Sequence, residues 1–295
     1  MNIIGKRNIF FVISLIVIVS GILFAAISGL NYGIDFTGGT LIQIDLGKTI
    51  PVDEVREITN EFDTKASIIH AGENKEQIII KSTLDLKNQE RLEVFNKFKE
   101  KYNLKDEAFI QSQKFGPAIG KEIQRKALIS VVIATLGMLA YITFRFEFKF
   151  GLSAIIALVH DVLVAITVYA FFKIPINGSF VAAILTIVGY SINDTIVVFD
   201  RIRENLKIMK KDKYEDIINT SISQTIVRSL NTSFTTLLAI VTLYIFGVEA
   251  IRDFALPLVV GIVVGTYSSI FIASPVWYLL KSRTSIKNNY NPNRV

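Results

Sequence analysis

Long apolar runs separated by short charged stretches make up most of the chain. A helix needs about 20 consecutive apolar residues to cross a bilayer. The runs that approach this length predict a membrane protein with an all-α transmembrane bundle of six helices. The predicted spans cover residues 9–28, 127–144, 151–172, 179–199, 222–246 and 254–280.

The polar segment between the first two spans shows the periodicities of a soluble domain. Strands are predicted over residues 40–45, 67–71, 77–82 and 108–112, and helices over residues 51–62 and 86–102. This strand–helix–strand–strand–helix–strand order is that of an α+β ferredoxin-like (βαββαβ) domain, here inserted between transmembrane helices 1 and 2. The expected regions are the N-terminus and first helix (1–29), the extracytoplasmic ferredoxin-like domain (30–126), transmembrane helices 2–6 (127–280) and a basic, disordered cytoplasmic tail (281–295).

Composition and charge support a membrane protein. Of the 295 residues, 51% are hydrophobic and 20% charged. The absence of cysteine excludes disulfides, thiolate metal sites and cysteine nucleophiles. We attribute the net charge of +6 to cytoplasmic loops rather than to nucleic-acid binding. Basic residues at 6–7, 145–149, 201–213 and in the tail then place both termini in the cytoplasm, and the first span is expected to be a retained helix, not a signal peptide.

Polar side chains interrupt the fourth predicted span. Asp194 lies where a lipid-facing helix carries leucines, and such a group costs roughly 2.5–3.5 kcal/mol at the centre of a span. Asn193 and Asp194 belong to a predicted polar seam along this helix. Asp200 and Arg201 then supply the charges expected where the helix leaves the membrane.

The third and fifth spans carry ionisable residues as well. Arg228 lies in the fifth span, with Asn231, Thr232 and Thr235 on the face predicted to point inward. Its depth matches that of Asp194 on an antiparallel neighbour, so the two are expected to meet as a charge pair. A proton relay requires inward-facing groups of this kind. The predicted relay residues are Asp194, Arg228, His160, Asp161 and Asn193.

Each of these groups also has a purely structural interpretation. Asp194 and Arg228 can form a fixed salt bridge that sets helix register. His160 and Asp161 can be an interior pair satisfied by hydrogen bonds to neighbouring helices. Spacing alone leaves both interpretations open.

Two glycine motifs lie outside the spans. Gly38 and Gly39 predict a tight turn that leads into the first strand, although composition alone favours an ordinary linker. The sequence GPAIGK at 116–121 has three residues between its glycines, whereas a phosphate-binding loop has four, and Glu122 stands where Ser or Thr is needed. We therefore expect no ATPase site, no other enzymatic site, no cofactor and no metal.

The motifs taken together resemble the SecF family, the smaller membrane subunit of the SecD–SecF protein-export complex. They are GIDFTGG at 33–39, GPAIGKE at 116–122, HDVLV at 160–164, VGYSINDTIVVFDRIREN at 188–205 and QTIVRSLNTS at 224–233. The residues assigned to structural positions in these motifs are Gly33, Asp35, Gly38, Gly39, Gly189, Asp200 and Arg201.

The resemblance implies a subunit, related to resistance-nodulation-division transporters, that uses the proton-motive force in late stages of Sec-dependent translocation. It implies a bacterial cytoplasmic membrane location and a role for Asp194 and Arg228 in proton movement. The implied partners are SecD, the SecYEG channel, YajC and the exported unfolded preprotein, with no nucleic acid. The alternatives are a single-half exporter of small molecules or lipids and a non-transporting scaffold.

Overall fold

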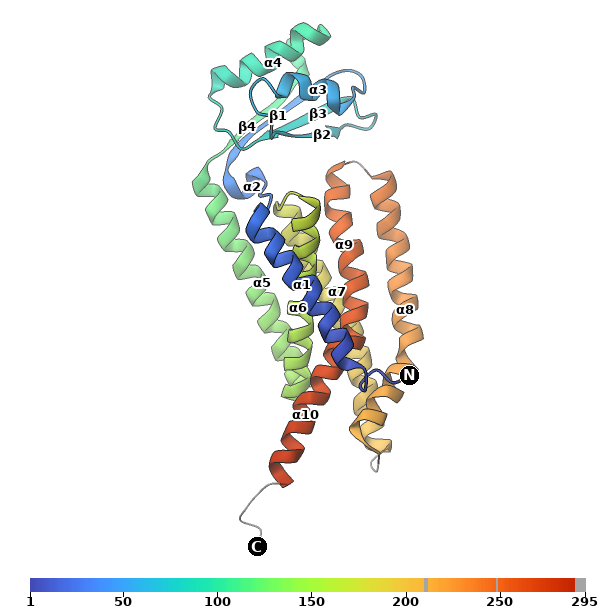
Figure 1. The fold of residues 1–295 in the computed structure, drawn as a ribbon. Coiled ribbons are helices and arrows are strands. Elements are labelled where there is room, and N and C mark those ends of the chain that lie inside the picture. Colours follow the sequence, from blue (N-terminus) through green and yellow to red (C-terminus); the bar gives the residue numbers. More distant parts are fainter. Residues whose placement is uncertain (210–211, 248, 290–295) are drawn as a thin grey trace.

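The structure is a computed structural model and describes residues 1–209, 212–247 and 249–289. It consists of a sheet domain seated on one end of a helical bundle, with the N-terminus and the last helix at the other end (Figure 1). Lys210 and Lys211 of the basic stretch 201–213, and residues 290–295 of the predicted tail, lie outside the described residues.

The sheet domain contains an antiparallel sheet of four described strands in the order β2-β3-β1-β4. Its strands are β1 (Gly39–Asp45), β2 (Ser67–Ala71), β3 (Gln77–Ser82) and β4 (Phe109–Phe115). Ile42 pairs with Ile80 and Ile44 with Ile78 in adjacent strands, and all four are buried. Helices α3 (Val52–Thr59) and α4 (Asn88–Tyr102) pack on them through an apolar core that includes Phe98. The predicted strands and helices of this segment are confirmed to within a few residues.

Within the described residues, six helices are long and apolar enough to cross a membrane. The first five are α1 (Arg7–Ser28), α5 (Pro117–Arg145), α6 (Phe148–Phe172), α7 (Gly178–Ile208) and α8 (Tyr214–Phe246). The sixth covers Ile251–Ser282 and is built from α9 (Glu249–Ser268), a π-helical turn η2 (Ser269–Ala273) and α10 (Ser274–Asn289). The six predicted spans are therefore confirmed as long apolar helices.

Several helices extend beyond the predicted apolar runs. The hydrophilic stretch that begins at Arg201, beyond the predicted fourth span, continues α7 to Ile208. Ion pairs one helical turn apart, Arg203 with Asp200 at 3.1 Å and Arg201 with Glu204 at 2.8 Å, support a helix there. Likewise α10 reaches Asn289, so the disordered tail predicted from residue 281 was wrong over its first part.

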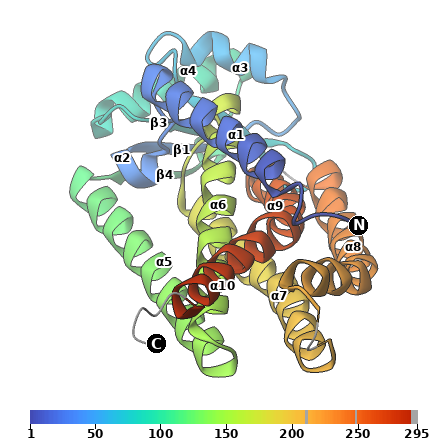
Figure 2. The ribbon, with the colours of Figure 1, turned by 60° about the horizontal axis from the view of Figure 1, so that its bottom comes forward.

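The helix α9 lies inside the bundle, with α5 and α8 on opposite outer sides (Figure 2). It packs closely on α7, because a Cβ added to Gly261 would lie 2.2 Å from the side chain of Ile187. At the end away from the sheet, Phe150 of α6 stacks on Trp277 of α10 with ring centroids 4.6 Å apart. These contacts fix α9 against α7 and α6 against α10.

Candidate functional site

Asp194 lies in α7, where its residue is only 3% exposed. The hydroxyl of Thr266 in α9 donates to its Oδ2 at 3.3 Å. Thr266 also shares a hydrogen bond with Ser233 of α8, and Tyr190 donates to Ser233 at 3.3 Å. The carboxylate is thus enclosed between α7, α8 and α9 and surrounded by hydroxyl groups rather than by a direct counter-charge.

Arg228 does not form the predicted charge pair. Its residue is exposed on α8, and among the described residues no ion pair joins it to Asp194. The expectation that Arg228, Asn231 and Thr235 point inward was wrong, since all three are exposed.

The inward face of α8 is a stripe of small hydroxyl residues that the sequence analysis missed. Its members are four residues apart and buried: Ser221, Thr225, Ser229 and Ser233. Successive residues of a helix point about 100° apart, so Ser229 faces the bundle while Arg228 turns away from it. The four-residue spacing of these Ser and Thr residues puts them on one helical face, but the spacing alone does not show that this face is the buried one.

His160 and Asp161 form a second buried polar cluster on α6. The His160 ring contacts Asp161 Oδ1 at 2.9 Å through Nδ1 and the hydroxyl of Ser14 in α1 at 3.0 Å through Nε2. Asp161 Oδ2 accepts hydrogen bonds from Ser191 of α7 at 2.6 Å and Ser268 of α9 at 2.8 Å. The pair has the bonding that its structural interpretation requires, and it ties together four helices.

The remaining predicted residues of α7 lie elsewhere. Asn193 and Gly189 are on its exposed face, and a Cβ at Gly189 would meet no atom within 4 Å. Asp200 and Arg201 make ion pairs along the helix beyond the apolar run, and Arg201 also donates to Gln224 of α8 at 2.7 Å. The predicted seam therefore divides into a buried part at Asp194 and an exposed part at Asn193.

The segment 33–39 is a joint between the sheet domain and the bundle, and it includes the short helix α2 (Ile34–Thr37). Gly33 donates its backbone N–H to Ile176 O at 2.9 Å, and Asp35 Oδ2 accepts the N–H of Gly178, the first residue of α7, at 3.0 Å. Gly38 and Gly39 have φ angles of +81° and +146°, which disfavour any residue with a Cβ. The motif thus joins β1 to the start of the helix that carries Asp194.

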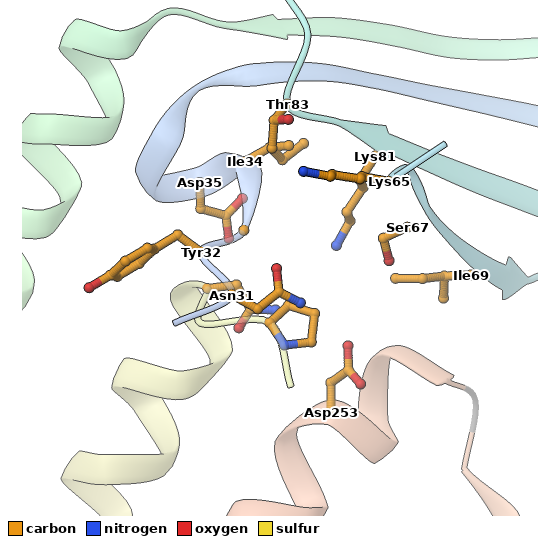
Figure 3. A pocket seen from close by; sticks show the side chains of 13 residues that line it. Asn31, Tyr32, Ile34, Asp35, Lys65, Ser67, Ile69, Lys81, Thr83 and Asp253 are labelled. Carbon is orange, nitrogen blue, oxygen red and sulfur yellow. The ribbon is translucent and has the colours of Figure 1, made fainter. Parts of the chain in front are cut away.

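A cavity of about 70 Å³ lies beside this joint, between the sheet and the helix ends (Figure 3). Lys65 and Lys81 project into it from the sheet domain, while Asp35 and Asp253 line it from the joint and from α9. Opposite charges therefore face each other across the boundary between the two parts of the molecule.

The second glycine of GPAIGK has a packing role. A Cβ at Gly120 would lie 2.5 Å from the carbonyl oxygen of Phe36, which also accepts a hydrogen bond from Gln124 at 2.8 Å. The first turns of α5 therefore rest against the backbone of α2. Among the described residues, no group of three or more His, Asp or Glu side chains is arranged to hold a metal ion.

Two family models match the chain. The one described as "Protein export membrane protein SecD/SecF, C-terminal" matches residues 94–283, and the "SecD/SecF GG Motif" matches residues 24–50. The second match contains the glycine joint, and the first contains Asp161, Asp194 and Arg228.

Similar proteins carry names of the same family. The chain is 40% identical to the protein translocase subunit SecF of Calditerrivibrio nitroreducens over 288 residues, covering 96% of this chain and 94% of the relative. It is 39% identical to SecF of Thermodesulfovibrio yellowstonii, with 97% of both chains covered. It is 36% identical to SecDF of Bacillus subtilis, covering 97% of this chain but 39% of that longer one.

Solved structures agree with these sequences. The crystal structure of SecDF from Thermus thermophilus matches with a TM-score of 0.83 and 37% identity, covering 96% of this chain and 39% of that chain. SecDF in its super-membrane-facing form matches with a TM-score of 0.76 and 35% identity, covering 98% and 40%. The chain is a multi-pass membrane protein and belongs to the SecD/SecF family of protein-export membrane proteins.

Proposed function

We propose that this chain is the SecF-type subunit of a SecD–SecF complex, which uses the proton-motive force to assist late stages of Sec-dependent translocation across the bacterial cytoplasmic membrane. The observation that carries the proposal is the buried Asp194, held in a cluster of hydroxyls within a membrane span. Intramembrane carboxylates of this kind characteristically bind and release protons. Energy comes from the gradient, and the chain has no ATPase role of its own.

The exposed polar residues of α7 and α8 support a SecD partner. Asn193, Arg228 and Asn231 are exposed on neighbouring membrane-spanning helices. Polar groups at this depth normally face protein or water rather than lipid. The SecDF proteins that match this chain are about two and a half times as long, since the chain covers 39% of them. SecD helices that cover this surface would bring Arg228 into a protein interior beside Asp194.

The sheet domain is proposed to be extracytoplasmic and ferredoxin-like. The order β2-β3-β1-β4, with helices between β1 and β2 and between β3 and β4, is the arrangement of that fold. The N-terminus and α10 lie at the bundle end opposite the sheet domain, so cytoplasmic termini place the sheet outside (Figure 1). There it can act beside SecD on an unfolded preprotein that leaves SecYEG, with YajC as a further partner.

The geometry supports a simple coupling scheme. When Asp194 is ionised, it accepts the Thr266 hydrogen bond and attracts Arg228 through space. Uptake of a proton removes the charge, and with it the attraction and part of that hydrogen bond. The contacts between α7, α8 and α9 then change. Because Asp35 holds the first turn of α7, such a change can reach the sheet domain.

The test is an export assay with the chain and SecD reconstituted beside SecYEG in vesicles, with and without an ion gradient. Asp194→Asn keeps the shape of the side chain but cannot exchange a proton at neutral pH. We expect it to abolish the stimulation by a proton gradient while the complex still assembles. Asp200→Asn, on the same helix beyond the apolar run, is the matched control and should stimulate normally. Parallel runs with a sodium gradient identify the coupling ion.

Normal proton-driven export by Asp194→Asn would refute the coupling role and leave a non-transporting scaffold. Transport of a small molecule or lipid without SecD would instead favour the exporter alternative.

A further inference from the structure

One short segment of α9 contacts both buried acidic clusters. Thr266 donates to Asp194 at 3.3 Å, and Ser268, two residues later, donates to Asp161 at 2.8 Å. Asp194 lies on α7 and Asp161 on α6, and Ser191 of α7 also donates to Asp161 at 2.6 Å. A hydroxyl from the same helical turn therefore reaches each of them.

The hydroxyls of this segment are buried and face different helices. Thr266 is 7% exposed, Ser268 0% and Ser269 1%. Ser269 contacts Thr195 of α7 at 2.8 Å and donates to the carbonyl of Ser191 at 3.3 Å. Each of these hydroxyls also lies within hydrogen-bond distance of a carbonyl of its own helix, Ile262 for Thr266 and Gly265 for Ser268 and Ser269. The contacts to α6 and α7 are therefore the ones that a shift of α9 changes.

The backbone of the same segment departs from the α-helix. Residues Ser269–Ala273 form a π-helical turn, and Ser274 donates its hydroxyl to the carbonyl of Ser269, five residues back, at 3.0 Å. π-turns are rare in globular proteins and are frequently found at functional sites. The extra residue in the π-turn rotates the residues of α10 about the helix axis relative to Thr266 and Ser268.

The segment of α9 around Thr266 and Ser268 packs tightly against α7. A Cβ at Gly265 would lie 3.0 Å from Cβ of Ser191, the residue that also donates to Asp161. Any displacement of α9 at Thr266 is therefore transmitted to Ser191 and Ser268 together, and through Asp161 to His160 and Ser14 of α1.

We propose that Thr266 and Ser268 are positioning residues through which α9 couples the two clusters, so that proton occupancy of Asp194 sets the arrangement of the His160–Asp161 cluster. The proposal rests on the proton-coupled function given above. Loss of the charge at Asp194 weakens the Thr266 bond, the π-turn accommodates the resulting shift of α9, and the Ser268–Asp161 bond passes it to α6 and α1.

The experiment uses the reconstituted complex with SecD and SecYEG, and compares proton-driven export by Thr266→Val, Thr266→Ser and Ser268→Ala. Valine keeps the shape of threonine without its hydroxyl, and serine restores the hydroxyl. We expect Thr266→Val and Ser268→Ala each to lower the gradient-dependent rate about tenfold, the effect of one lost hydrogen bond to a charged group. Thr266→Ser should export at close to the wild-type rate, because serine keeps the hydroxyl although it packs less well than valine.

A variant that combines Thr266→Val with Ser268→Ala supplies a second readout, because the two losses of rate should not be additive. If the two residues act through one segment, the double variant should be no slower than the slower single variant within about twofold. Thr186→Val is the matched control, because the Thr186 hydroxyl is exposed and donates only to its own helix at Ala182. Thr266→Ala replaces Thr266→Val if the valine variant does not yield folded complex.

The proposal is overturned if Thr266→Val exports at the wild-type rate, if Thr266→Ser fails to recover the rate, or if the two losses multiply. Each of these outcomes leaves the proposed function standing as long as Asp194→Asn abolishes the stimulation. Normal export by Asp194→Asn overturns both.

Discussion

Replacing Gly120 with alanine probes the contact between the first turns of α5 and the glycine joint. A Cβ at this position would lie 2.5 Å from Phe36 O, 2.8 Å from Phe36 C and 3.3 Å from the backbone nitrogen of Gly38. All three are backbone atoms of the segment that leads into β1, so no side-chain rotation relieves the overlap. The backbones of α5 and α2 must separate to accommodate the methyl group.

The magnitude follows from that geometry. Real Cβ atoms essentially never approach another atom within 3.0 Å, so the backbones must move apart by at least about 0.5 Å. Overpacking of a well-packed contact costs about 1–3 kcal/mol, and immovable backbone neighbours place Gly120→Ala at the upper end. A loss of about 3 kcal/mol corresponds to a roughly hundredfold change in the unfolding equilibrium.

The assay is thermal unfolding of the detergent-purified full chain, read as the fraction that remains monodisperse after heating. A loss of this size lowers the midpoint by roughly 5–10 °C in a chain of this length. Gly137→Ala is the matched control, since Gly137 lies on the same helix and a Cβ there meets no atom within 4 Å. It should leave the midpoint unchanged or raise it slightly, because alanine favours helix by about 1 kcal/mol over glycine.

Equal midpoints for the two alanine variants would refute the close contact of α5 with the joint. Lower stability of both would show that glycine is needed along α5 for a reason other than Phe36.

Two further substitutions test the joint and the bundle core. Asp35→Ala removes the acceptor of the Gly178 N–H and should cost about 1 kcal/mol, measured as faster hydrogen exchange of the backbone amides at the start of α7. In Asp35→Asn, which keeps an acceptor oxygen, these amides should exchange at close to the wild-type rate. Trp277→Ala removes a fully buried ring that stacks on Phe150 and should lower the free energy of unfolding by about 3–5 kcal/mol, measured by thermal unfolding. Trp277→Phe should lower it by less. An unfolding midpoint near wild type for Trp277→Ala would contradict the stacking of Trp277 on Phe150.

Local pattern was sufficient to predict the elements of this chain. Alternation in residues 67–71 and 77–82 predicted β2 and β3 with the observed bounds. The apolar runs predicted the six long helices, because hydrophobic length is a property of consecutive residues. Helix ends were predicted less well, because α7 and α10 continue beyond the apolar runs into charged residues. In α7 the ion pair between Arg203 and Asp200 supports this extension.

For the candidate site, too, the sequence predicted some features and only the structure showed the others. The chemistry of Asp194, His160 and Asp161 was visible in the sequence, because ionisable residues within apolar runs are rare. The neighbours of these groups were not, since each comes from a helix distant in sequence: Thr266 for Asp194, and Ser14 and Ser268 for the His160–Asp161 pair.

The orientation of α8 shows most clearly what tertiary structure decided. Both faces of this helix carry polar residues at helical spacing, so periodicity alone did not distinguish the face of Arg228 from that of Ser229 and Ser233. Closely packed helices accommodate small side chains between them, so the Ser and Thr residues of α8 face the interior and the long side chain of Arg228 faces outward. The amino-acid sequence therefore determined which groups the membrane spans contain, and only the packing of six helices determined which of those groups meet, because a rotation of about 100° on one helix exchanges one set of partners for another.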